Sequence, residues 1–191
     1  MEPALAYQYE YEAYEFINGE EYMMARPSIA HSEIKYNITT LFKNYLRGKR
    51  CRAFDEVDVY LNDEDHVIPD VVIVCNPDII NKKRIEGAPD LVVEILSRST
   101  GKKDRTVKLM TYAKYGVKEY WIVEPAGKSV EVYLLKDGAY DLDNIYYFYT
   151  EEEWEDMDDE ERKLAESQKM IKVSLYDDFM IDVGDVFYDV D

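Results

Sequence analysis

Two acidic residues stand where acids are uncommon, beside and inside apolar runs. Asp70 follows Pro69 at the start of "PDVVIV", and Glu94 lies within the apolar run of "PDLVVEIL". An ionised carboxylate is buried only with a compensating partner, so Glu94 requires a cation nearby. Two neighbouring carboxylates also repel each other, which raises a carboxyl pKa. A divalent ion with oxygen ligands removes that repulsion, and the open water positions of Mg²⁺ suit phosphate chemistry.

Two strands are expected to position these carboxylates. A period of two places Glu94 on one face of its strand together with Val92 and Leu96. Asp70 opens the preceding strand, where a proline without an N–H donor is tolerated. If the two strands are neighbours, the carboxylates meet near one edge of the sheet. A structural alternative stays open, in which Glu94 pairs with a buried lysine or arginine and Asp70 caps a turn.

The rest of the chain predicts an α/β (α+β) fold with a central mixed β-sheet flanked by helices. Asn18-Gly19 between two strand-like runs predicts an N-terminal β-hairpin. Ser28 is expected to cap a helix that runs to Leu46, and Gly116 to end a second helix from about residue 102. Further strands are expected at about 52–60, 68–75, 90–96, 118–125, 129–138 and 140–150.

No repeat or linker marks a domain boundary, so residues 1–191 are predicted to form a single domain. Thr150 and Glu153 form a capping-box pattern at the start of an acidic helix. This helical elaboration spans about residues 151–166, and its simplest interpretation is a solvent-facing appendage.

The net charge of −18 argues against nonspecific binding to a polyanion, but the charge is unevenly distributed. Residues 151–191 carry a net charge of −12, whereas residues 1–150 carry only −6. Basic residues gather shortly after Glu94, and we consider four of them as nucleic-acid contacts. They are Arg98, Lys102, Lys103 and Arg105. A solvated surface is the alternative for this cluster.

Composition also bears on where the protein works. No apolar stretch approaches the roughly 20 residues that span a bilayer, and the N-terminus lacks the pattern of a signal peptide. The two cysteines are too few for a disulfide framework and indicate a reducing compartment. With only two histidines and no Cys/His cluster, a zinc site is not expected. We therefore expect a cytoplasmic protein without membrane contact.

Several long segments resemble a known family. "VIPDVVIV", "GAPDLVVEILSRST" and "DRTVKLMTYAKYGVKEYWIVEP" are similar, in order and spacing, to the core of the bacterial Uma-two family of restriction-endonuclease-like proteins, within the PD-(D/E)XK nuclease superfamily. "YEFINGEEYMMARPSIAH" and "YDDFMIDVGDVF" resemble that family's beginning and end, so the resemblance covers nearly the whole chain. It implies a restriction-endonuclease-like core and hydrolysis of DNA phosphodiester bonds with Mg²⁺, for which Mn²⁺ can substitute.

The resemblance also implies roles for particular residues. Asp70 and Glu94 match the metal-binding acids, and the backbone carbonyl of Ile95 matches a further ligand. The superfamily signature places a lysine two residues after the glutamate, but position 96 is leucine. Lys108 on the following helix matches the family pattern and is the expected catalytic lysine. Glu33 on the first helix is an additional candidate for an outer metal ligand.

Other interpretations remain at this point. Lys108 could instead form an exposed i,i+4 pair with Asp104. His31 is expected to be a packed, hydrogen-bonded histidine, and Tyr112 and Trp121 are expected in the core. The rival functions are a non-catalytic adaptor or nucleic-acid-binding protein on a nuclease fold, and a glycosidase built on the carboxylate pair. DNA is the expected partner, and a homodimer is left open.

Overall fold

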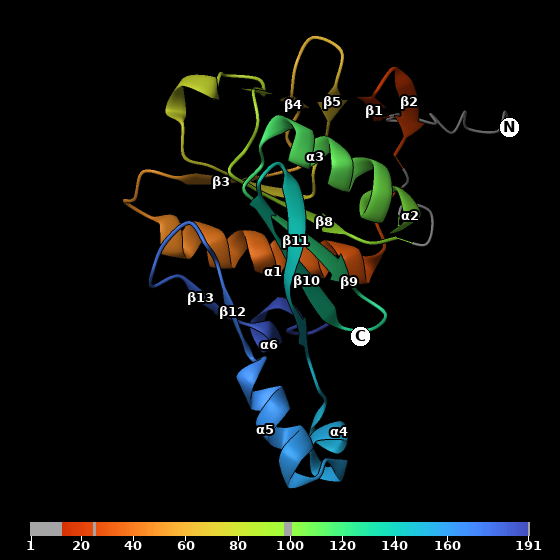
Figure 1. Ribbon diagram of the computed structural model, residues 1–191, viewed down its shortest axis with the longest axis vertical. Helices are drawn as coiled ribbons and strands as arrows, with labels where there is room; N and C mark the ends of the chain where they lie inside the picture. The colour runs from red at the N-terminus through yellow and green to blue at the C-terminus, as the bar shows by residue number, and fades with distance from the viewer. Residues whose placement is uncertain (1–12, 25, 98–100, 191) are drawn as a thin grey trace, which may run out of the picture.

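The centre of the molecule is a six-stranded mixed sheet. The computed structural model describes residues 13–24, 26–97 and 101–190. The strands of this sheet are β3 (Arg52–Asp55), β6 (Val71–Val74), β8 (Leu91–Ile95), β9 (Glu119–Glu124), β10 (Ser129–Lys136) and β11 (Ala139–Tyr147). They lie in the order β11-β10-β9-β8-β6-β3, and only β8 and β9 are parallel (Figure 1). The structure confirms the expected mixed sheet.

One face of the sheet is covered by α1 (Ile29–Leu46), which crosses it as Figure 1 shows. The Ser28 side chain accepts a hydrogen bond from the His31 backbone N–H, so the expected N-cap is present. Ile34, Ile38 and Phe42 recur on the inner side of α1 and are fully buried. The closing segment packs on the same face, and it comprises β12 (Met170–Lys172), β13 (Met180–Asp182) and α6 (Val183–Val186).

The other face carries a second helix and a small sheet. The helical segment comprises α2 (Gly101–Lys103), a π-helical turn (Asp104–Lys108) and α3 (Leu109–Tyr115). Gly116 ends it in the left-handed conformation, with φ of 80°, as expected. The small sheet has the order β2-β1-β5-β4-β7. Its strands are β1 (Tyr14–Ile17), β2 (Glu20–Met23), β4 (Val59–Tyr60), β5 (His66–Val67) and β7 (Ile85–Glu86).

The chain crosses between the two sheets where the sequence predicted continuous strands. The expected strand at 52–60 is divided into β3 and β4, and the expected strand at 68–75 reduces to β6. Glu56 has a φ of 45°, a left-handed conformation that a strand cannot contain. The predicted hairpin is confirmed, because Asn18 and Gly19 both have positive φ between β1 and β2.

The acidic appendage contains two helices instead of the expected one. They are α4 (Glu151–Asp156) and α5 (Asp159–Ser167), and we call them together the acidic lobe. Thr150 and Glu153 form the predicted capping box. Asp158 forms a second capping box with Glu161, which starts a new helix at that point. The lobe projects from the lower end of the body in Figure 1.

The two cysteines are joined, contrary to the expectation of free thiols in a reducing compartment. Arg52 pairs with Val74 across β3 and β6, which places Cys51 and Cys75 opposite each other just beyond the ladder. They form a disulfide. No helix in the described part of the chain is long and apolar enough to cross a membrane.

Asp65 ties the N-terminal hairpin to the body. Its Oδ1 accepts a hydrogen bond of 2.7 Å from the backbone N–H of Asn18. Its Oδ2 accepts one of 2.6 Å from the Tyr115 hydroxyl and lies 3.3 Å from the Lys114 Nζ. Burial opposes ionisation of Asp65, but these hydrogen bonds outweigh it and hold its pKa below the ordinary value of 3.8.

Replacing Asp65 with asparagine tests this link. The folded-state pKa is lowered, so ionised Asp65 stabilises the fold above its ordinary pKa, and this contribution is lost as pH falls through the folded value. We expect Asp65→Asn to lower the free energy of unfolding at neutral pH by about 1–3 kcal/mol. Urea unfolding should then show a smaller loss of stability below pH 3.8 for the variant than for the parent protein. Equal losses on acidification would contradict the role given to Asp65.

Candidate active site

The two carboxylates singled out in the sequence lie side by side. Val71 of β6 pairs with Val93 of β8 in an antiparallel ladder. Asp70, the residue before the start of β6, therefore lies alongside Glu94. Every residue of β8 is buried, and Glu94 and Asp70 are only 4% and 7% exposed. The strands are therefore neighbours, as the sequence argument required.

Asp70 is held by two partners. Its Oδ2 accepts a 2.7 Å hydrogen bond from the backbone N–H of Ile95, the residue after Glu94. Its Oδ1 lies 3.2 Å from Nε2 of His31, in the first turn of α1. The expectation of a packed, hydrogen-bonded histidine is confirmed, and its partner is the candidate metal ligand. These contacts fix the carboxylate between the sheet and α1.

Lys108 contacts Glu94 from the face of the sheet opposite to the one that α1 covers. Its Nζ lies 2.8 Å from Glu94 Oε1 and 2.7 Å from Glu15 Oε1, and the side chain is 3% exposed. It belongs to the π-helical turn, a wider turn that often occurs at functional sites and here buries both Lys108 and Asp104. The alternative of an exposed Asp104–Lys108 pair is therefore wrong. The two side chains do approach each other, with Asp104 Oδ1 3.9 Å from Lys108 Nζ, but both are buried.

Glu15 is part of this cluster and was missed in the sequence. It is 0% exposed, and its Oε1 accepts a hydrogen bond of 3.1 Å from the Ile68 backbone N–H. Its Oε2 lies 2.7 Å from Nζ of Lys103. A usable signal existed, because the period of two puts Glu15 on the same face of β1 as buried Ile17. It was an acid on the apolar face of the hairpin.

Tyr112 has a polar role besides the expected core position. Its ring is fully buried, and its hydroxyl donates a 2.6 Å hydrogen bond to Glu94 Oε1. One oxygen of Glu94 thus accepts from both Lys108 and Tyr112. Trp121 lies fully buried in the core, as expected.

The cluster surrounds a narrow cavity with surplus negative charge. The cavity has a volume of about 60 Å³. Five carboxylates and three permanently charged basic side chains line it; the acids are Glu15, Glu56, Asp70, Glu94 and Asp104, and the bases are Arg26, Lys103 and Lys108. Glu56 is also paired with Lys35, whose Nζ lies 2.6 Å from Glu56 Oε1. With that pair set aside, the lining keeps a surplus of one negative charge, which favours a cation in the cavity.

The direction of the pKa shift of Glu94 agrees with this surplus of negative charge. Burial raises the pKa of Glu94 to about 8, and although Lys108 opposes this, Asp104, Asp70 and Glu15 add to it. For Glu15, burial is outweighed by Lys108 and Lys103, which lower its pKa. Among the described residues, Glu15 is paired with two lysines, Lys103 and Lys108, whereas Glu94 is paired with Lys108 alone. Burial and the neighbouring carboxylates thus oppose ionisation of Glu94, and a cation in the cavity would favour the ionised form.

The donor set fits a hard divalent ion with few protein ligands. Asp70, Glu94 and Ile95 all line the cavity. Mg²⁺ keeps several waters and commonly takes one or two carboxylates, with substrate phosphate completing its shell. Within the described ranges, no three acidic, histidine or cysteine side chains are arranged to hold one ion. The fit therefore rests on the carboxylate pair and the strand backbone.

The remaining sequence candidates have different positions. Glu33 lines a separate cavity with Tyr36 and Tyr188, so the structure does not bring it to the carboxylate pair. Arg98 lies outside the described residues. Lys102 is exposed, whereas the Lys103 side chain is only 13% exposed because it pairs with Glu15. The alternative of a solvated surface therefore does not hold for Lys103.

Arg105 is also engaged within the protein. Its guanidinium lies 2.6 Å from a Glu131 oxygen and 3.5 Å from a Glu124 oxygen. Lys103 and Arg105 are therefore both paired with acidic residues. Lys102 differs from them, because it is exposed and forms no ion pair with another described residue.

Known proteins resemble this chain in sequence and in fold. An uncharacterized protein of Synechocystis sp. is 32% identical over 129 residues, which cover 66% of this chain and 68% of that protein. A crystal structure of "a putative nuclease belonging to DUF820" from Anabaena variabilis aligns with a TM-score of 0.67 at 20% identity. The alignment covers 92% of this chain and 89% of that one, and at this identity it shows a shared fold.

A family model places the chain more specifically. It matches residues 3–163, a span that includes Glu15, both strand carboxylates and Lys108. The family's description is "Putative restriction endonuclease". Because the match extends over most of the sequence, the chain belongs to the Uma2 family.

Proposed function

We propose that this protein is a Mg²⁺-dependent endonuclease that hydrolyses DNA phosphodiester bonds. The observation that carries the proposal is the contact of Lys108 with Glu94 in a cavity shared with Asp70. The same three residues match the family's expected metal-binding acids and lysine. The cavity's excess of negative charge supports a cationic cofactor.

Each residue has a role that follows from its position. Asp70 and Glu94 would hold the ion, together with the Ile95 carbonyl. When bound, Mg²⁺ or Mn²⁺ supplies polarisation of a phosphate oxygen and a more acidic water. Lys108 would orient the attacking water and offset the negative charge that develops on the phosphate. Glu15 holds the Lys108 ammonium in place, and His31 does the same for Asp70.

A non-catalytic adaptor is the second candidate. It is favoured by the absence of a three-ligand cluster among the described residues and by the pairing of Lys108 with Glu94. A buried ion pair of this kind can be a purely structural feature. The two candidates differ in whether the carboxylate pair binds a metal ion.

Neutral substitutions of the carboxylates test the proposed metal site. Asp70→Asn and Glu94→Gln keep the side-chain shape but remove the charge that attracts the ion. Outer-shell substitutions at metal sites already cost about 10–100-fold, so we expect each variant to lose at least about 100-fold in Mn²⁺ affinity. Mg²⁺-dependent cleavage of circular duplex and single-stranded DNA should be abolished.

Calorimetric titration with Mn²⁺ measures the affinity, and thermal denaturation verifies that the variants fold. Glu33→Gln is the matched control, because Glu33 lines a different cavity, and it should behave as the parent protein. Undiminished cleavage by Asp70→Asn or Glu94→Gln would show that the metal assignment is wrong. A parent protein that neither binds Mn²⁺ nor cleaves DNA would favour the adaptor.

Lys108→Met tests the catalytic lysine separately from the metal site. Methionine retains much of the apolar stem, so the main loss is the charge, and turnover should fall by roughly 100-fold or more. Mn²⁺ affinity should hold or rise, because a repelling cation is gone. Lys103→Met is the matched control, since it removes the other ammonium from Glu15 and leaves Lys108 in place. Loss of turnover in the Lys103 variant alone would reverse the assignment.

The exposed lysine of the basic segment should contribute to DNA affinity. Lys102→Glu is expected to weaken binding and to reduce the slope of log affinity against log salt by about 1, because fewer counterions are released. Lys163→Glu on the acidic lobe changes the net charge equally and should leave the slope near that of the parent protein. Fluorescence anisotropy at several salt concentrations gives both slopes. Equal effects of the two variants would place the DNA-binding surface elsewhere.

A further inference from the structure

The acidic lobe carries charge that the rest of the molecule does not neutralise. Residues 151–166 contain ten carboxylates and two basic side chains. One of the bases, Arg162, donates hydrogen bonds to the backbone carbonyls of Trp154 and Glu155, so it fastens α5 to α4. Across the described residues, none of the ten carboxylates lies within ion-pair distance of a lysine or arginine. The lobe is therefore a strong local source of negative potential.

A large cavity lies between this lobe and the body. Its volume is about 620 Å³, within the range that accommodates small ligands or several side chains. Aromatic rings of Tyr147 and Trp154 line it, and Tyr147 is 38% exposed. Carboxylates of Glu151, Glu155 and Asp185 line it as well. Aromatic faces and carboxylates together match an organic cation.

The cavity has little positive charge of its own. Lys169 is the basic residue among the described residues that line it, and its Nζ lies 3.2 Å from Asp182 Oδ2. This cavity shares no described lining residue with the cavity of Asp70 and Glu94. The two cavities are therefore distinct sites.

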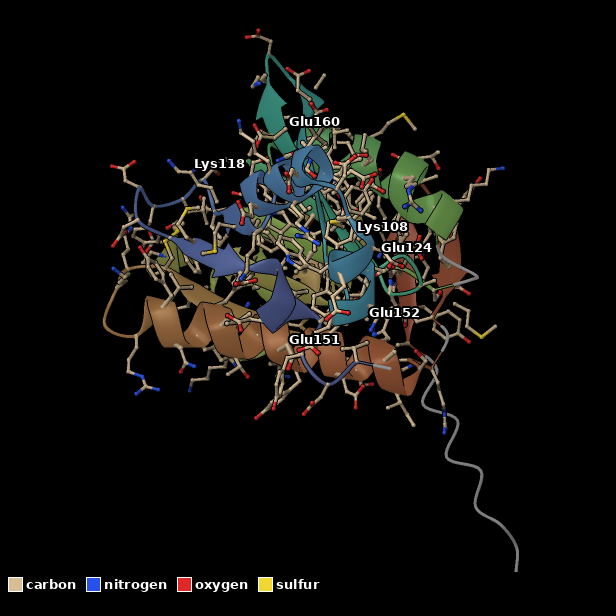
Figure 2. All side chains as sticks on the ribbon, turned by 90° about the horizontal axis from the view of Figure 1, so that it is seen from below. Lys108, Lys118, Glu124, Glu151, Glu152 and Glu160 are labelled. Atoms are coloured by element: carbon tan, nitrogen blue, oxygen red, sulfur yellow. A yellow bond between two sulfur atoms is a disulfide. The ribbon has the colours of Figure 1, made fainter. Side chains whose placement is uncertain are left out.

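We propose that this cavity binds an arginine- or lysine-rich segment of a partner protein. A guanidinium or ammonium group would enter between the aromatic rings and the lining carboxylates. The acids continue well beyond the cavity, and Figure 2 shows Glu151, Glu152 and Glu160 on the helices of the lobe. An extended basic segment would use that wider surface, whereas a small organic cation would need only the cavity. The proposal does not depend on nuclease activity.

Charge disfavours two other occupants. Nucleic acid would be repelled by the lobe, because its phosphates have the same sign of charge. A second copy of this chain would bring another net charge of −18 to the contact. A basic segment instead has the complementary charge, which speeds encounter and selects the partner.

The position of Trp154 offers a direct measurement. The chain has two tryptophans, and Trp121 is fully buried in the core whereas Trp154 lines the cavity. The probe is a fluorescein-labelled peptide of alternating arginine and serine, and the matching peptide with glutamate for arginine is the negative control. We expect saturable binding by anisotropy and, with unlabelled peptide, a change in tryptophan emission.

Two double variants separate a defined site from general attraction of charge. Glu151→Gln with Glu155→Gln removes two charges from the cavity wall. Glu152→Gln with Asp156→Asn removes two charges with the same spacing on the same helix, but neither residue lines the cavity. We expect the first pair to raise the dissociation constant at least about tenfold and the second to change it by less than about threefold.

Several results would overturn the proposal. Equal weakening by both pairs would indicate diffuse attraction to a polyanion, and an unchanged tryptophan emission would place the peptide outside the cavity. Competition by spermidine at the same concentration as the peptide would indicate a small-cation site instead. Concentration-dependent self-association that the peptide abolishes would identify a second copy as the occupant. Trp154→Ala provides the complementary test and should also weaken binding.

Discussion

The burial of Glu94 is the constraint on which the rest of the site depends. Glu94 belongs to β8, which lies between the neighbouring strands β9 and β6, and it is only 4% exposed to solvent. Two other elements supply the side chains that surround this charge. The helical segment after β8 supplies Lys108 and Tyr112, and the hairpin supplies Glu15 to hold the lysine. A buried carboxylate in a strand thus requires hydrogen-bond donors and a positive charge in the elements around it.

Position 96 is leucine, whereas the nuclease signature that the sequence resembles would place a lysine there. Leu96 is 5% exposed and packs in the core cluster on the Glu94 face of the sheet, so a lysine there would replace an apolar contact. The helix lies over this face, and its π-helical turn directs Lys108 toward the strand. Lys108 nevertheless brings an ammonium to 2.8 Å from Oε1 of Glu94. The requirement is for an ammonium beside the carboxylate, from whichever element can reach it.

Much of this architecture could be predicted, because its signals are local. The Asn18-Gly19 turn, the Ser28 cap, the alternation around Glu94 and the left-handed Gly116 each depend on a few adjacent residues. Two of the missed features are completed by contacts between distant segments. Glu15 becomes a site residue only when the hairpin packs on the helix, and Cys51 meets Cys75 only through the β3–β6 register. The division of the acidic helix at Asp158 had a local signal, a second capping box, that was not used.

The docked hairpin has a consequence for how the protein is made. Glu15 and Lys103 are 88 positions apart in the chain, so their contact closes a long loop and forms after local helices and turns. A growing chain has synthesised the hairpin long before the helix against which it packs. Until that helix is available, the buried face of the hairpin is exposed to other strands and to chaperones. The cluster can therefore assemble only after the chain has been synthesised through Tyr112, so a shorter nascent chain lacks the site.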